Sequence, residues 1–266
     1  MKTEKPHYHQ STLTHYYVCP HKMELSRIHS IEQTMPMREG LLFEFYALGM
    51  NPRAKKIFDT PEKYELSLIG RKKPETIDPI KKKAEYVKQF FLEPQNAYQV
   101  LLYEDRHYIN GGEADYVGEL IYGRNKAQLR CIADLKFTSD VASWRFLNKA
   151  TDYFQSLYYV YILWKMTGQI LPFVYVVVDS SFDIPMVSFK KFTFTKENLL
   201  QLKKEVDFIH NDIIRKPKVS QETCIKGPYN KRCDYLEWCE HGRELIESSM
   251  EIEFDELIPN YLTNED

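Results

Sequence analysis

Three charged side chains near the middle of the chain could form a catalytic site. Asp115 lies in one stretch with strand character, Asp134 and Lys136 lie in the next, and a polar turn separates the two. If this turn is centred between Arg124 and Asn125, Asp115 lies opposite Asp134 in a β-hairpin. If the turn is centred one residue later, Asp115 lies opposite Lys136. Because side chains alternate along a strand, all three share one face in either register.

This set of side chains suits a divalent metal ion and a phosphate group. Two carboxylates opposite each other on neighbouring strands repel, and burying them costs free energy unless a cation lies between them. Oxygen ligands from two strands suit Mg²⁺ or Mn²⁺, which also accept phosphate oxygens. Lys136 would add a positive charge that can hold a phosphate oxygen and help an attacking water lose its proton. The alternative is an ordinary ion pair between Asp115 and Lys136, with Asp134 in solvent.

The segments around this hairpin predict an α/β domain with helices packed on a central β-sheet. We predict strands over 99–108, 113–121, 129–137, 170–178 and 187–194. We predict helices over 38–48, 152–166 and 197–214, and two short helices over 11–28 that meet near Pro20. Short helices and loops are expected over 51–78, a helix resumes near Pro79, and Gly111-Gly112 is expected to form a turn.

Composition is that of a globular protein and leaves the partner open. The chain has 266 residues, 43% of them apolar, and its formal net charge of -2 neither supports nor excludes nucleic acid. The N-terminus lacks the apolar core of a secretory signal, which predicts a cytoplasmic protein. The apolar region 157–178 is interrupted by Lys165, Gly168 and Pro172, so we expect no membrane association. No Gly-x-x-x-x-Gly-Lys phosphate loop occurs, so no ATPase is predicted.

The two strand segments carry a family resemblance. Residues 112–117, Gly-Glu-Ala-Asp-Tyr-Val, and 132–138, Ile-Ala-Asp-Leu-Lys-Phe-Thr, resemble the core of the PD-(D/E)XK nuclease superfamily, particularly its RecB-like exonuclease branch. The resemblance implies a restriction-endonuclease-like core in which a central mixed β-sheet is flanked by helices. It also implies a single nuclease domain over 1–266, with a helical segment, 1–50, and a cysteine-bearing segment, 215–266, packed on that core.

Further motifs of that branch occur in the same order along the chain. Residues 11–20, from Ser-Thr-Leu to Cys-Pro, are similar to its helical opening. Residues 38–44 resemble its next motif, in which a helix carries a histidine or a glutamate, here Glu44, toward the metals. Gln155 and Tyr159 resemble its Gln-x-x-x-Tyr motif, and their spacing puts both on one helix face. Each motif is short, but their ordered occurrence is more specific than any single one.

The resemblance implies a role for each of these residues. Oxygen atoms of four residues would hold the metal ions: Glu44, Asp115, Asp134 and, through its carbonyl, Leu135. Lys136 would assist the nucleophile, and Gln155 and Tyr159 would face the active site and the DNA. Many relatives have histidine in place of Glu44, and others have glutamate in place of Asp134. Neither departure removes a metal ligand.

These features together predict a metal-dependent nuclease that hydrolyses single- or double-stranded DNA with Mg²⁺ or Mn²⁺. An exonuclease in DNA recombination, repair or phage DNA processing is favoured, working alone or with separate recombination or helicase proteins. One alternative is a catalytically idle nucleic-acid-binding protein of the same fold, against which the intact set of Asp115, Asp134 and Lys136 argues. Another is an RNA nuclease, which shares the same metal chemistry.

Cysteines form a second group of interest. In some members of the branch, one N-terminal and three C-terminal cysteines hold a four-iron, four-sulfur (4Fe-4S) cluster, and the candidates here are Cys19, Cys224, Cys233 and Cys239. Five residues separate Cys233 from Cys239, as in the family, whereas Cys224 lies further from Cys233 than in the family. Zinc and four unliganded thiols are the alternatives. Cys131 is expected to pack in the core, and His21 to be solvated.

Overall fold

The computed structural model describes residues 5–29, 31, 33–70, 72–123, 125–139, 150–214, 233, 235 and 239. The chain divides into two compact units. The first comprises Met1–Gln10 and Gln33–Glu205, and the second comprises Ser11–Glu32 and Val206–Asp266. All the residues predicted to take part in hydrolysis belong to the first unit.

A mixed sheet of six strands forms the centre of the first unit. The strands are β1 (His7–His9), β2 (Ala97–Glu104), β3 (Ile109–Tyr122), β4 (Ala127–Thr138), β5 (Phe173–Asp179) and β6 (Val187–Phe192). Their order is β1-β3-β4-β5-β6, and β2 pairs with β3. The β1–β3 and β4–β5 pairs are parallel, and the other pairs are antiparallel. The predicted α/β class with a central mixed sheet flanked by helices is confirmed.

Helices surround this sheet, and several begin at a proline. They are α3 (Met35–Leu48), α4 (Pro52–Ile57), α5 (Pro61–Ile69), α6 (Pro74–Lys88), the 3-10 helix η1 (Pro94–Asn96) and α8 (Ala150–Thr167). A further helix, α9 (Lys196–Ile214), begins in the first unit and ends in the second. A proline suits a first helical position because its missing N–H would have no partner there. The side chains of Asn51 and Thr60 accept hydrogen bonds from the first turns of α4 and α5. The prolines of the predicted irregular segment thus start helices.

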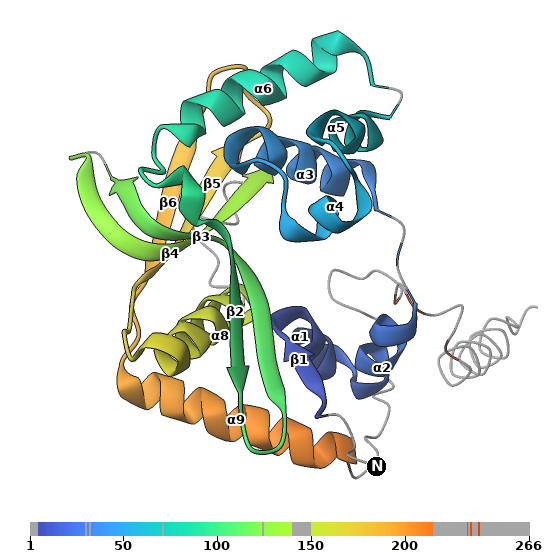
Figure 1. Cartoon of the computed structure of the whole chain (residues 1–266), viewed down its shortest axis with the longest axis vertical. Helices are drawn as coiled ribbons and strands as arrows, with labels where there is room; N and C mark the ends of the chain where they lie inside the picture. The colour runs from blue at the N-terminus through green and yellow to red at the C-terminus, as the bar shows by residue number, and fades with distance from the viewer. Residues whose placement is uncertain are drawn as a thin grey trace, which may run out of the picture. The chain divides into compact units, whose positions relative to one another are not determined.

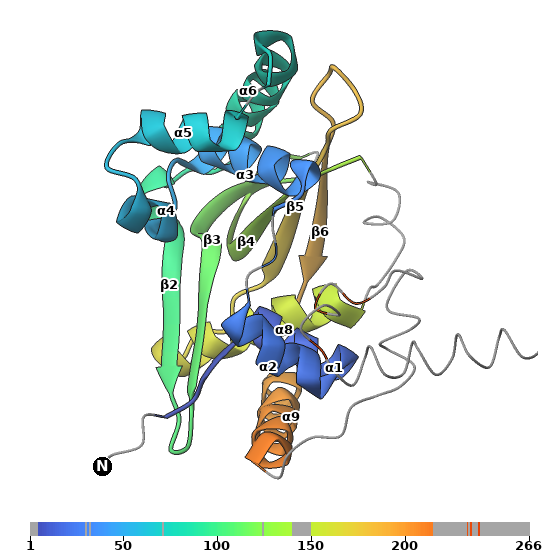
Figure 2. The same ribbon diagram turned by 90° about the vertical axis from the view of Figure 1, so that its right-hand side faces the viewer.

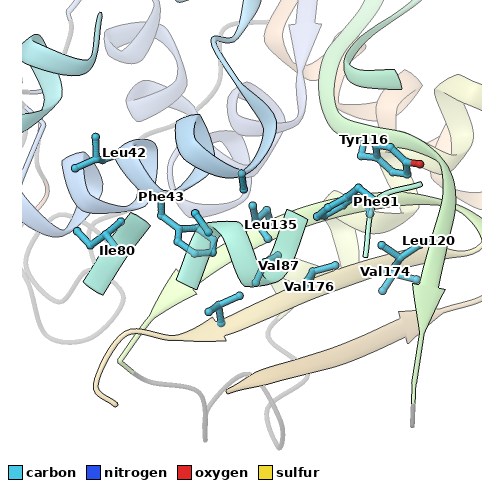
Figure 3. Packing of buried hydrophobic residues seen from close by; sticks show 14 of the residues in the cluster. Leu42, Phe43, Ile80, Val87, Phe91, Tyr116, Leu120, Leu135, Val174 and Val176 are labelled. Carbon is cyan, nitrogen blue, oxygen red and sulfur yellow. The ribbon is translucent and has the colours of Figure 1, made fainter. Parts of the chain in front are cut away.

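The helices α3 to α6 pack against apolar residues on one face of the sheet (Figure 3). Phe43 of α3 stacks on Phe137 of β4, with ring centroids 4.5 Å apart. Each fully buried side chain of this kind contributes about 1.5–3 kcal/mol to stability. On β4 this cluster includes Ala133 and Leu135. Because side chains alternate along the strand, Asp134, which lies between these two, points to the other face.

The helix α8 packs closely on β3. The Tyr158 hydroxyl donates a hydrogen bond to the Tyr8 carbonyl at 2.8 Å, and the Tyr159 ring stacks on Phe173. A Cβ atom at Gly112 would lie only 2.4 Å from the Tyr159 ring. The predicted turn at Gly111-Gly112 is therefore wrong: both glycines lie inside β3, where Gly112 allows this approach.

The strands β3 and β4 form the predicted hairpin and then separate. They pair from Tyr122↔Ala127 to Tyr116↔Ala133, which confirms the register with the turn centred between positions 124 and 125. On the N-terminal side of Tyr116, β3 continues with β2 and β1 and runs away from β4 (Figures 1 and 2). We call this point of separation, at Tyr116 and Ala133, the fork.

In the second unit, α1 (Gln10–Val18) and α2 (Pro20–Ile28) meet at Cys19, as predicted. The Tyr16 hydroxyl donates a hydrogen bond to Asp212, and Leu25 packs with Tyr235 and Cys239. Within the described ranges of both units, no helix combines the length and apolar character needed to span a bilayer.

The contact between Gly112 and Tyr159 predicts a stability effect. Gly112→Ala would push a methyl group into the Tyr159 ring, so we expect the free energy of unfolding to fall by about 1–3 kcal/mol. Gly40→Ala is the control, because an added Cβ there meets nothing within 4 Å. That helical substitution should be neutral or stabilise the chain by about 0.5–1 kcal/mol. Urea denaturation measures both, and equal stability of Gly112→Ala and the wild type would contradict the packing argument.

Candidate active site

Asp115 lies at the fork and bridges the separating strands. It directly precedes Tyr116, the last β3 residue that pairs with β4 in the hairpin ladder. Its Oδ2 atom accepts a hydrogen bond of 2.7 Å from the Leu135 backbone N–H. A residue in a strand directs its N–H and C=O toward the same neighbouring strand. The Leu135 carbonyl is therefore also directed toward the β3 side of the fork.

Asp134 is held between a cation and an amide. It is only 5% exposed, and its Oδ2 lies 2.5 Å from the Lys136 ammonium nitrogen. Its Oδ1 accepts a hydrogen bond of 2.9 Å from the Gln155 side chain. The alternative with Asp134 in solvent and Lys136 paired to Asp115 is therefore wrong. Lys136 pairs with its neighbour two positions back on the same strand face.

Glu44 reaches the same site from α3. Burial and the Asp134 charge raise the pKa of this half-buried carboxyl to about 7. The Tyr98 hydroxyl lies within hydrogen-bonding reach of Glu44 and donates to the Gly49 carbonyl at 2.9 Å. Tyr98 lies between the Ala97↔Tyr116 and Gln99↔Ala114 pairs of the β2–β3 ladder and has a left-handed backbone with φ of 55°. The tyrosine thus connects the end of α3 to the site.

A chain of hydrogen bonds fixes the Gln155 amide. The hydroxyl of Tyr175, a fully buried residue, donates to Gln155 Oε1 at 3.2 Å, while Gln155 Nε2 donates to Asp134. These two contacts define which way the amide points. Tyr159, one helical turn from Gln155, is buried, and its pKa is raised by this burial and then by Asp134 and Asp115. Both residues of the predicted Gln-x-x-x-Tyr motif therefore lie at the carboxylates.

The site holds more acidic than basic side chains. Burial, then Asp134 and Glu44, raise the pKa of Asp115 well above its usual value. Lys136 is the cation that most lowers the pKa of both Glu44 and Asp115. Burial alone would lower the pKa of Lys136, but Asp134 and Asp115 outweigh it and the net pKa is raised. Lys136 therefore stays protonated at neutral pH and acts through its charge.

The chemistry of these groups fits a hard divalent cation. In the described part of the chain, no three His, Cys, Asp or Glu side chains already form a ready ligand group. Asp134 Oδ2 is nevertheless a buried oxygen whose close partner among the described residues is the Lys136 ammonium alone. Together with Glu44, Asp115 and the Leu135 carbonyl, this oxygen gives the donor types that Mg²⁺ and Mn²⁺ prefer.

The structure brings together all the residues that the sequence predicts for this site: Glu44, Asp115, Asp134, Leu135, Lys136, Gln155 and Tyr159. Sequence reasoning missed Tyr98 and Tyr175. Tyr175 is the parallel partner of Asp134 across β4 and β5, a register that no local motif reveals. Sequence reasoning also missed Glu113, although its position two residues before Asp115 on one strand was a usable signal.

The cysteine group lies in the second unit. Cys19 and Cys239 are buried, Cys233 is half-buried, and Cys224 falls outside the described residues. The Sγ atom of Cys239 lies 3.6 Å from Nδ1 of His21, a residue that was expected to be solvated. Cys131 is fully buried in the core of the first unit, as expected, and burial raises its pKa to about 12. Its thiol is therefore no nucleophile at neutral pH.

Comparisons with known proteins support the fold. No family model matches the chain, and no curated protein matches it. It is similar to the crystal structure of "Putative exonuclease" from Eubacterium rectale, with a TM-score of 0.52 and 13% identity over 89% of this chain and 86% of that chain. A structure named SSO0001 has a TM-score of 0.32 and 11% identity over 86% and 96% of the two chains, too low a score to support an argument. At 13% identity, the first likeness concerns the fold alone.

The charge balance predicts an energetic coupling between Asp134 and Lys136. In the presence of EDTA, Lys136→Met leaves the carboxylates without this cation, so we expect the free energy of unfolding to fall by about 1–3 kcal/mol. The double variant Asp134→Asn, Lys136→Met should lose less than the two single variants together, by about 1 kcal/mol or more. Strictly additive losses would contradict the coupling.

The exposed pair of Lys63 and Asp59 provides the control for this measurement. Their nitrogen and oxygen atoms lie 2.7 Å apart, but their side chains are 61% and 82% exposed. Lys63→Met should therefore change the free energy of unfolding by only about 0.5 kcal/mol or less.

Proposed function

We propose that this chain is a nuclease that uses Mg²⁺ or Mn²⁺ to hydrolyse DNA, and specifically an exonuclease. One observation carries the proposal: three carboxylates and a protonated lysine converge where β3 separates from β4. Packing alone does not account for this arrangement, because like charges in partly buried surroundings reduce stability. The Leu135 carbonyl at the same place adds a further oxygen donor of the type that a hard cation prefers.

The side chains divide the work as follows. Glu44, Asp115, Asp134 and the Leu135 carbonyl would hold the divalent cation, which when bound neutralises phosphate charge and makes water more acidic. Lys136 binds a phosphate oxygen through its permanent positive charge. Gln155 holds the Asp134 carboxylate in place and is itself held by Tyr175. Tyr159, one helical turn from Gln155, would face the active site and the DNA from the same helix.

We further propose membership of the RecB-like branch of the PD-(D/E)XK superfamily. The ordered motifs support it, as does the placement of their residues around one site. The likeness of the fold to that of "Putative exonuclease" agrees with it. Such an enzyme would act on DNA ends in recombination, repair or phage DNA processing. Recombination or helicase proteins would be its partners, since the sequence contains no phosphate loop of its own.

Substitution of the charged residues tests the proposed activity. Asp134→Ala removes a ligand and Lys136→Ala removes the phosphate-binding charge, so each should lower Mg²⁺-dependent DNA hydrolysis by roughly a hundredfold or more. The exposed Lys82 of α6 is the control, and Lys82→Ala should retain full activity.

The assay compares linear DNA, circular DNA and RNA. Hydrolysis of linear DNA alone is expected, cleavage of circles would contradict an exonuclease, and cleavage of RNA alone would identify an RNA nuclease. A wild type without activity on any of the three would favour the idle binding protein.

The cysteines are proposed to hold a 4Fe-4S cluster or a zinc ion with a structural role, separate from hydrolysis, because sulfur ligands do not favour Mg²⁺. Protein prepared without oxygen should show sulfur-to-iron absorption or stoichiometric zinc. Cys233→Ser should abolish that signal and lower the melting temperature. The control is Cys131→Ser. Cys131 lies in the core of the other unit, so this substitution should leave the metal content unchanged. Absence of both metals, with Cys233→Ser as stable as the wild type, would leave unliganded thiols.

A further inference from the structure

The short helix α4 exposes three basic side chains, Arg53, Lys55 and Lys56. Among the described residues, none of the three has a hydrogen bond or an ion pair. Burial raises the pKa of Glu113 on β3, and the positive charges of all three side chains lower it in part. The chain as a whole has a net charge of -2, so this helix is a local concentration of positive charge beside the acidic site.

Three lysines of neighbouring segments, in contrast, form ion pairs. Lys63 of α5 pairs with Asp59, Lys72 pairs with Glu39, and Lys81 of α6 pairs with Glu65. Three lysines on the segments that follow α4 are therefore neutralised by ion pairs. The fold leaves the cations of α4 without an ion-pair partner in the described structure, as is expected of a surface that meets an anion.

The helix α4 is anchored to the elements that form the site. Its Asn51 cap accepts a hydrogen bond from the Ala54 N–H at 2.8 Å, and Ala54 is buried in the main core cluster. Just before this cap, the Gly49 carbonyl accepts the hydrogen bond from Tyr98, whose hydroxyl also reaches Glu44. The basic side chains of α4 thus project from a short helix held by the same contacts that position the carboxylates.

Glu113 indicates where these cations lie relative to the carboxylates of the candidate site. It precedes Asp115 by two residues on β3, in the part of the strand that has left β4. Arg53 also acts electrostatically on His9 of β1, which is exposed and lies 3.1 Å from the Gly111 carbonyl. The hydrogen bond from Tyr98 of β2 to the Gly49 carbonyl holds the start of α4 beside this part of β3, so the cations of α4 lie on the N-terminal side of the fork.

We propose that Arg53, Lys55 and Lys56 bind the backbone phosphates of the DNA strand next to the bond that is cut. This proposal rests on the proposed function and adds a substrate-binding surface to it. A six-residue helix is about 9 Å long, enough to face about two successive phosphates of one strand. Binding through phosphates alone is independent of base sequence, which suits an enzyme that degrades DNA from an end.

Binding measurements on a charge-neutralised variant test the proposal. The double variant Arg53→Gln, Lys56→Gln removes two cations one helical turn apart, and Lys82→Gln, Lys196→Gln removes two exposed lysines of α6 and α9 as the matched control. Fluorescence anisotropy gives the affinity for a labelled single-stranded oligonucleotide at several salt concentrations, with EDTA present to prevent cleavage. Hydrolysis of bis(4-nitrophenyl) phosphate, which has no flanking phosphates, reports on the chemistry in Mg²⁺.

The α4 variant should bind the oligonucleotide roughly tenfold more weakly. The slope of log affinity against log salt should fall in magnitude by about 1.4, because each phosphate contact on a single strand contributes about 0.7. Its hydrolysis of the small phosphodiester should stay unchanged, and the control pair should bind like the wild type. The charge-conserving variant Arg53→Lys, Lys56→Arg should restore binding, which separates lost charge from lost folding.

Several results would overturn the proposal. Equal affinity and salt dependence of the α4 variant and the wild type, with DNA still cleaved, would remove α4 from the substrate path and leave the nuclease function in place. Equal losses of affinity in the α4 variant and in the control pair would show that binding depends on the net charge of the protein and not on the position of these cations. A wild type that binds and cleaves RNA but not DNA would contradict the proposed substrate. A wild type that neither binds nor cleaves any nucleic acid would remove the proposed function and this surface with it.

Discussion

Mutual repulsion of carboxylates is the constraint that the candidate site has to meet. Asp115, Asp134 and Glu44 raise one another's energy in partly buried surroundings, and Lys136 compensates for only part of this. Side chains on flexible loops would relax away from one another. Here each carboxylate comes from a strand or helix whose apolar neighbours are buried, such as Leu135 on β4. Burial of the apolar core thus offsets the free energy that the repulsion among these carboxylates costs.

Much of this arrangement follows from local rules. The hairpin register was predictable because one short turn sets which residues lie opposite each other, and this placed Asp115 and Asp134 together. Glu44 and Gln155 were predictable as residue types at motif positions on helices. The helices and strands with strong apolar periodicity were also predictable, because their pattern reports which face is buried.

The remaining features depend on long-range packing. The parallel pairing of β4 with β5 brings Tyr175 beside Asp134, and no property of either segment alone specifies that register. The strand β1 has only three residues, too few for a periodic pattern. Gly112 was assigned to a turn because glycine is common in turns, whereas its role is to admit the Tyr159 ring. In each case the deciding partner lies far away in sequence.

The left-handed backbone at Tyr98 has a consequence for which residues this position can hold. A tyrosine in that conformation costs about 1 kcal/mol, which glycine would not incur. The hydroxyl that reaches Glu44 and the Gly49 carbonyl depends on keeping the tyrosine there. Glycine at this position would relieve the strain, but it would remove a buried ring and the hydroxyl that connects α3 to the carboxylates. The backbone and the side chain thus place opposite demands on this single position.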